Sequence, residues 1–189
     1  ATAGSGGLPP ALIAELDTAI RLNDLMLVQD LLQAGHVEAS LALHRAVAAE
    51  CSNEMLDMLL ETGADINRPD SLGRSPLMYA VIRKSLSMAS ALVTKGADVE
   101  GGGQSYSGRT PLMQAASSGS MQLVQLLLDQ GADPEAEDRF GRSVLMQAAM
   151  MGKRDIVKRL EKHLKSNKGP KVTKLSTNRR PSPAPAGGG

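Results

Sequence analysis

The sequence predicts an all-α solenoid in which pairs of helices stack along one axis. One observation is a phrase that occurs three times, as GRSPLMYA from Gly73, GRTPLMQA from Gly108 and GRSVLMQA from Gly141, at intervals of 35 and 33 residues. A second is the phrase Gly-Ala-Asp, which begins at positions 63, 96 and 131. A unit of this length cannot bury its own apolar face, so consecutive units must stack on one another.

The first unit follows a short leader. Residues 1–10 contain Gly, Ser and Pro without periodicity, which predicts a flexible segment. A helical pattern begins at Ala11, and apolar residues then recur at helical spacing through two short helices. Gly35 stands where the C-cap glycine of the second helix is expected. We therefore assign the first unit to residues 11–39.

Four further units are expected at residues 40–69, 70–104, 105–137 and 138–164. Each pairs a leucine in its first helix with one in its second, as 16 with 31, 43 with 59, 77 with 92, 112 with 127, and 145 with 160. The separation is larger by one only in the second unit, where the turn at Glu50–Asn53 has an extra residue. Ser75-Pro76 and Thr110-Pro111 are good helix starts, because a hydroxyl caps free amides and Pro fits the first turn.

The fourth unit resembles an ankyrin repeat. The resemblance is carried by Thr110-Pro111-Leu112-Met113-Gln114-Ala115-Ala116, Ser118-Gly119, Leu123-Val124, Leu127-Leu128 and Gly131-Ala132-Asp133. It extends over about 11–164 as four to five repeats. It implies helix-turn-helix units joined by β-hairpin loops, with the hairpin tips and first helices on one concave side that binds partners.

Three departures from the repeat pattern carry expectations. The first unit lacks the Thr-Pro start, and the last ends in Glu161-Lys162-His163 in place of a second leucine. Both fit terminal caps, whose outer faces must be polar. The third unit has Lys84-Ser85 where the family usually has Gly-His, so we expect its inter-helix turn to be irregular.

The composition limits the kinds of side chain in the core and indicates the cellular compartment. Aromatic residues make up only 2% of the 189 residues, so the core must be aliphatic. The single cysteine, Cys51, excludes an intrachain disulfide and favours a reducing intracellular compartment. No apolar run is long enough to cross a membrane. Because the sequence starts with Ala1, we expect a fragment or a processed product.

Charge is distributed unevenly along the chain. Residues 1–152 hold 10 basic and 18 acidic side chains, whereas residues 153–189 hold 11 basic and two acidic ones. Residues 165–189 have little to bury and are expected to form a disordered, basic tail. The tail could bind nucleic acid, although it lacks interleaved aromatics, bind an acidic protein, act as a nuclear import signal, or serve as a solvated linker to a further domain. Ser182, after Arg179-Arg180-Pro181, is a candidate phosphorylation site.

Catalysis is not expected. His44 occupies the slot where ankyrin repeats often carry a structural histidine, and Cys51 lies in an inter-helix turn. No second titratable group stands at a spacing that suggests a catalytic pair or a metal site. We therefore expect neither an enzyme nor a cofactor.

The better candidates are surface positions. The resemblance implies that the tip residues and the two residues after each Ala pair face the concave side. Candidate partner-binding residues on this side are Arg74, Ile82, Arg83, Tyr106, Arg109, Arg139, Phe140, Arg142, Met150 and Met151. Arginine and large apolar residues are common anchors of interfaces. The arginine row could equally be solvated, and the long loop at 101–107 could contact a partner or be a tolerated insertion.

These observations predict a protein–protein interaction module, acting as an adaptor, scaffold or regulatory domain through its concave groove. The alternative is a nucleic-acid-associated or chromatin-associated protein that uses the basic tail, with the repeats recruiting partners. We expect a monomeric, intracellular domain without a membrane partner. The cytoplasm is the favoured location and the nucleus is the alternative.

Overall fold

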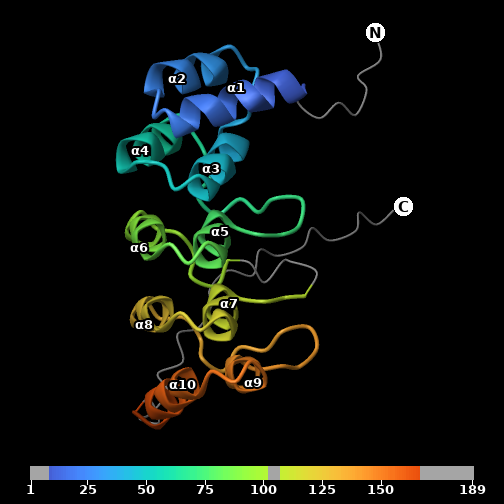
Figure 1. Ribbon diagram of the computed structural model, residues 1–189, viewed down its shortest axis with the longest axis vertical. Coiled ribbons are helices and arrows are strands. Elements are labelled where there is room, and N and C mark those ends of the chain that lie inside the picture. The colour runs from blue at the N-terminus through green and yellow to red at the C-terminus, as the bar shows by residue number, and fades with distance from the viewer. Residues whose placement is uncertain (1–8, 102–106, 167–189) are drawn as a thin grey trace, which may run out of the picture.

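The computed structural model describes residues 9–101 and 107–166, which form ten α-helices arranged in five pairs (Figure 1). The helices are α1 (Pro10–Arg21), α2 (Leu25–Gln33), α3 (Ala39–Ala48), α4 (Asn53–Glu61), α5 (Pro76–Ile82), α6 (Leu86–Thr94), α7 (Pro111–Ser118), α8 (Met121–Asp129), α9 (Val144–Met150) and α10 (Arg154–Ser166). The first helix begins one residue before the periodic pattern, because proline is well suited to the first helical position.

The helix pairs stack into an elongated solenoid. In Figure 1 the odd-numbered helices form one column and the even-numbered helices α2, α4, α6, α8 and α10 form a second column beside it. The loops before α5 and α9 project from the side of the odd-numbered helices. This layout gives the molecule one face built from first helices and loop tips, as the sequence predicted.

The core follows the leucine register. Leu16, Leu43, Leu77 and Leu112 in the first helices are fully buried, and their partners in the second helices are buried as well. Leu145 is half-buried, since it belongs to the last helix pair. The core is aliphatic, as the composition required, and it runs continuously from α1 to α10.

Helix starts use the hydroxyl caps that the sequence predicted. The side chains of Ser75, Thr110 and Ser143 each accept a hydrogen bond from the backbone amide three residues later, at 3.2 to 3.3 Å. Each cap satisfies one amide that the first helical turn leaves unpaired.

The turn between α5 and α6 is regular, so the expectation of an irregular turn at Lys84 was wrong. Lys84 adopts φ +59°, close to the left-handed conformation of Gly119 in the next pair, at φ +84°. The amide of Lys84 bonds the carbonyl of Val81, and the amide of Gly119 likewise bonds that of Ala116. Lysine therefore adopts the backbone geometry that glycine supplies elsewhere. In the second pair, Cys51 is the extra residue between left-handed Glu50 and the cap Ser52.

The loops are turns with very little strand character. In the described residues the only β-bridge outside a helix joins Glu137 to Ser143, so the β-hairpins implied by the resemblance are reduced to tight tips. The Asp of each Gly-Ala-Asp phrase shapes the start of its loop. Asp65, Asp98 and Asp133 each accept a hydrogen bond from the amide two residues later, at 2.9 Å.

The two ends of the stack are less polar than expected. Leu22 and Met26 at the N-terminal end are 73% and 75% exposed. At the other end Met146 is 55% exposed, although the corresponding Met78 and Met113 are buried by the helix pair that follows them. The outer surface of α10 is polar, but α9 leaves apolar side chains uncovered.

Candidate partner-binding face

Each loop tip in the third and fifth helix pairs is organised by one aspartate. Asp138 accepts hydrogen bonds from the backbone amides of Phe140 and Arg142 and from the Arg142 guanidinium. It also accepts one from the side-chain amide of Gln147, at 2.9 Å. Its side chain has no exposed surface. Arg142 also lies over the Phe140 ring, with the guanidinium carbon 4.8 Å from the ring centre. Arg142 therefore has a structural partner inside its own tip.

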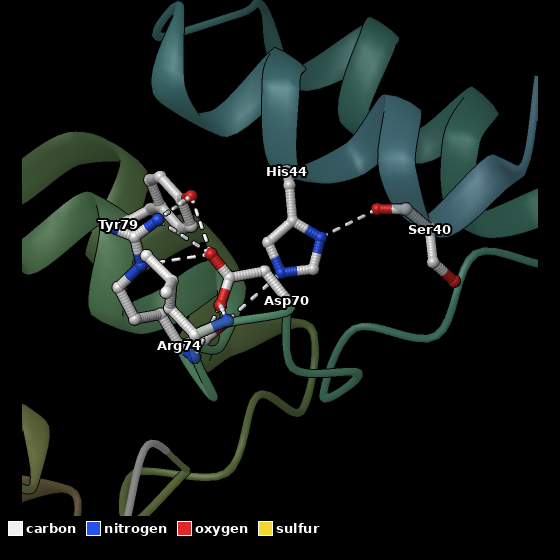
Figure 2. Close-up of polar contacts among 6 residues, drawn as sticks. Ser40, His44, Asp70, Arg74 and Tyr79 are labelled. Atoms are coloured by element: carbon white, nitrogen blue, oxygen red, sulfur yellow. Dashed lines mark hydrogen bonds and ion pairs between the residues drawn. The ribbon is translucent and has the colours of Figure 1, made fainter. Parts of the chain in front are cut away.

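Asp70 makes the same arrangement in the third pair (Figure 2). It accepts bonds from the amides of Leu72 and Arg74, from the Arg74 guanidinium at 2.8 Å, and from the Tyr79 hydroxyl at 2.8 Å. Tyr79 stands nine residues after Asp70, as Gln147 does after Asp138.

The Asp70 tip is strongly polarised. Burial raises the pKa of Asp70, but the bonds from Arg74, Tyr79 and the Leu72 amide outweigh burial and bring the pKa down to about 2. Burial, together with its bond to Asp70, raises the pKa of Tyr79. The carboxylate stays ionised and the phenol stays protonated at neutral pH, which keeps the tip locked.

His44 has the structural role that the sequence predicted. Its Nδ1 lies 2.8 Å from the carbonyl oxygen of Ser40 in α3, and its Nε2 lies 3.2 Å from that of Arg74 in the next tip. The ring also packs edge-on against Tyr79, with centroids 5.6 Å apart. His44 thus ties the second helix pair to the tip of the third (Figure 2).

Arg109 differs from the other two tip arginines. It donates to the Ser117 hydroxyl at 2.7 Å, while its Nε is buried without a hydrogen-bond partner. Burial lowers the pKa of Arg109, and repulsion from Arg142 lowers it further. The position that holds aspartate in the other two tips is Ser105, which lies outside the described residues. The arginine row is therefore not uniform.

Side chains at the ends of the first helices form a row beside the tips, and their size changes along the stack. The contact between Arg109 and Ser117 places the end of the first helix next to the tip. By repeat equivalence, the corresponding positions are Ala48, Ile82 and Met150, followed by Ala49, Arg83 and Met151. The row is small at its N-terminal end and large and apolar at its C-terminal end, where Met150 and Met151 are 70% and 59% exposed. Phe140, in the neighbouring tip, is 62% exposed.

A groove of about 760 Å³ occupies the N-terminal half of this face. It exists where the row carries alanines, and α1, α3 and the loop before α5 form its walls. It is lined by Asp17, Arg21, Glu38, Ser40, Leu41, His44, Arg45, Ala48, Ala49, Arg68, Pro69, Asp70, Ser71, Arg74 and Tyr79. Of this set, the sequence indicated Arg74 as a candidate partner-binding residue and His44 as a structural residue. The charged side chains of α1 and α3 had no repeated motif that could point to them.

Ion pairs cross the groove. Arg45 donates to Asp17 at 3.1 Å, Arg68 pairs with Glu38 at 2.8 Å, and Arg74 pairs with Asp70. The first of these joins α3 to α1, so it links neighbouring helix pairs across the concave side. The groove is lined by charged side chains together with the small residues Ala48 and Ala49.

The other candidate residues occupy varied positions. Ile82 is 42% exposed, and Arg83 is exposed within 3.9 Å of Glu50. Arg139 lies against Gly108, because a Cβ at Gly108 would be 2.8 Å from its Cγ. Tyr106 and Ser182 lie outside the described residues.

Cys51 and the metal-binding residue types offer no second site. Burial raises the pKa of the Cys51 thiol to about 11, so the thiolate required of a nucleophile is scarce at neutral pH. Across residues 9–101 and 107–166 no group of three His, Cys, Asp or Glu side chains could hold a metal ion. None of the described helices has both the length and the apolar character needed to cross a membrane.

The five stacked helix pairs define a repeat protein, and comparison with known families identifies the class. The ankyrin-repeat model, which spans three copies of the repeat, matches residues 16–103 and 100–171. The chain therefore belongs to the ankyrin-repeat family, whose repeats are protein–protein interaction modules.

The curated relatives match parts of the chain. Transient receptor potential cation channel subfamily A member 1 of Homo sapiens is 45% identical over 58 residues, which is 31% of this chain and 5% of that protein. B-cell lymphoma 3 protein homolog of Mus musculus is 44% identical over 77 residues, or 40% of this chain and 16% of that protein. B-cell lymphoma 3 protein of Homo sapiens is 50% identical over 58 residues, which is 30% of this chain and 13% of that protein. The chain spans less than a fifth of each relative.

Proposed function

We propose that this chain is a non-enzymatic interaction module that binds a partner protein with its concave face, as an adaptor, scaffold or regulatory segment. The observation that carries the proposal is the exposure of Phe140, Met150 and Met151, each more than half uncovered, on the face built from first helices and tips. The Phe140 ring has few rotatable bonds, and the flexible methionines can adapt to the shape of a partner, so these side chains serve as interface anchors.

The tip networks support this proposal. Asp138 fixes Arg142, and Arg142 in turn stacks on Phe140, so the exposed ring is held before any partner arrives. Preorganisation of this kind lowers the ordering cost of association. Ile82 would extend the contact toward the groove, and Arg74, Arg83, Arg109 and Arg139 would border it.

The domain is proposed to act as an intracellular monomer. The chain has a single thiol, Cys51, and so no intrachain disulfide, which suits a reducing compartment. Light scattering of the purified chain would test the oligomeric state.

The experiment compares two double variants that remove equal apolar surface. The wild-type chain captures a partner from a lysate of its source cells, and the captured protein is then purified and titrated against each variant. Phe140→Ala with Met150→Ala should weaken binding by about tenfold or more. Leu22→Ala with Met26→Ala, at the opposite end of the stack, should leave the affinity unchanged.

Two outcomes would count against the proposal. Equal loss in both double variants would mean that the concave face is not the binding surface. Binding that disappears on removal of residues 167–189, falls steeply with salt and extends to duplex DNA would favour the nucleic-acid function instead.

A further inference from the structure

The groove concentrates positive charge in a part of the chain that is otherwise acidic. Residues 1–152 contain 10 basic and 18 acidic side chains. Four of those basic residues line the groove, namely Arg21, Arg45, Arg68 and Arg74, against three of the acidic ones. A basic groove within an acidic body attracts and orients an anionic ligand.

The carboxylates of the groove are already paired. Asp17 accepts from Arg45, Glu38 from Arg68, and Asp70 from Arg74. Each pairing uses an arginine of the same groove, so the negative charges are neutralised from within.

Arginine donors remain after these pairs are made. In the described part of the chain, no hydrogen bond or ion pair engages Arg21, which is exposed at the end of α1. Arg45 reaches Asp17 through Nη1 alone, so its Nη2 makes no hydrogen bond within residues 9–101 and 107–166. Among the described residues, the groove therefore has arginine N–H groups without partners, whereas each of its carboxylates is already paired with an arginine.

The shape of the groove suits a polypeptide segment. Ala48 and Ala49 line the groove beside the arginines, and such small side chains let a backbone approach. A guanidinium presents planar, paired N–H donors that match the two oxygens of a carboxylate. Side-chain carboxylates of an approaching segment could thus bind Arg21 and Arg45 together.

We propose that the groove of the first three helix pairs receives an acidic segment of the partner protein, whose Asp or Glu side chains pair with Arg21 and Arg45. This inference rests on the proposed function, since it names the chemistry of the partner that the concave face binds. The chain's own C-terminal end does not suit the groove, because residues 165–180 carry six basic side chains and no acidic one.

The test uses a displayed library of random short peptides, selected on the full immobilised chain. The selected peptides should be enriched in Asp and Glu, and the best of them is synthesised for titration. Arg21→Gln, at an exposed helix end, should weaken this peptide by about tenfold, and the additional change Arg45→Gln should weaken it further. Raising the salt concentration should weaken it as well.

A matched control removes the same charge elsewhere. Lys84→Gln with Arg154→Gln changes two exposed basic residues outside the groove and should leave the peptide's affinity within about twofold of the parent. Thermal unfolding of every variant checks that the fold is kept, and Arg21→Gln alone decides the matter if the double variant is unstable.

The outcomes separate this inference from the proposed function. Selected peptides without an excess of acidic residues, or equal binding to Arg21→Gln and the parent, overturn the inference. So does a groove that is occupied by duplex DNA or by a second copy of the chain. If the captured protein still depends on Phe140 and Met150 in those cases, the concave face remains a protein-binding face and only the acidic segment is rejected.

Discussion

Arg142 donates a hydrogen bond from Nε to Asp138 at 2.8 Å, its Nη2 forms an ion pair with the same oxygen at 2.8 Å, and this carboxylate has no exposed surface. The same two residue types, four apart, recur as Asp70 and Arg74 in the third helix pair. The arginine of these two tips therefore holds its loop in shape, in addition to the partner contact that we propose for it. This double role separates what a substitution does to stability from what it does to binding.

Arg142→Met is expected to destabilise the domain by about 2–3 kcal/mol, because it leaves the buried Asp138 without its cation. Methionine keeps most of the apolar stem, so the loss reports the charge. Urea denaturation gives the free energy of unfolding. Arg68→Met, which breaks the exposed pair with Glu38, should cost less than about 1 kcal/mol. Equal losses in the two variants would show that the tip network adds nothing to stability.

Arg109→Met is expected to stabilise the domain, in contrast to Arg142→Met. Its Nε is buried without a partner, and Arg142 repels it. Asp138 attracts Arg109, but removing a half-buried cation with an unpaired donor should still raise the free energy of unfolding by about 0.5 kcal/mol. Calorimetry of Arg109→Met beside Arg142→Met compares the same slot in adjacent repeats. A lower melting temperature for Arg109→Met would mean that its bond to Ser117 outweighs the charge penalty.

The Asp70 tip should weaken in acid. The pKa of Asp70 is about 2 in the folded chain, below its usual value of 3.8, so folding favours the ionised form. This contribution is fully present above about pH 4 and is lost as the pH falls toward 2, and it amounts to roughly 1–2 kcal/mol after allowance for solvent screening.

Asp70→Asn provides the measurement. The difference in unfolding free energy between the parent and this variant should be largest near neutral pH and should shrink between pH 4 and pH 2. Tyr79→Phe removes one donor to the carboxylate and so raises the folded-state pKa of Asp70, which should make the acid-sensitive loss smaller and complete at a higher pH. A difference that stays constant with pH would contradict the depressed pKa.

Much of the fold could be predicted from the sequence, because a stack of repeats places equivalent residues in equivalent environments. The leucines at 16, 43, 77 and 112 share one register, and all are buried. The hydroxyl caps at Ser75 and Thr110 follow from local chemistry alone, and the structure confirms them.

The candidate site could be predicted only in part. The row of tip arginines was visible, and so was an aspartate four residues before two of them, but only the folded tip shows that the two side chains bind each other. The groove depends on contacts between different repeats, such as Arg45 with Asp17, 28 positions apart. Such pairs have no period, so sequence patterns do not indicate them.

Lys84→Gly is expected to stabilise the domain by about 0.5–1 kcal/mol. Lys84 has φ +59°, a conformation that costs a residue with a Cβ more than it costs glycine. Arg83→Gly is the matched control, because Arg83 has φ −71° and glycine there should lower stability by a similar amount. Thermal unfolding of the Lys84→Gly and Arg83→Gly variants compares their stabilities. Loss of stability in Lys84→Gly would show that the unfolded-state entropy of glycine outweighs the relief of strain.

Met113 and Met146 occupy the same repeat position in two adjacent repeats. Met113 in α7 is fully buried by the fifth helix pair, whereas Met146 in α9 is 55% exposed at the open end of the stack. Met113→Ala removes packed atoms between repeats and should cost about 2–5 kcal/mol. Met146→Ala should change the free energy of unfolding by less than about 0.5 kcal/mol. Chemical denaturation of both variants tests this contrast. A large loss in Met146→Ala would mean that this face is covered in solution, in which case the stack does not end at α10.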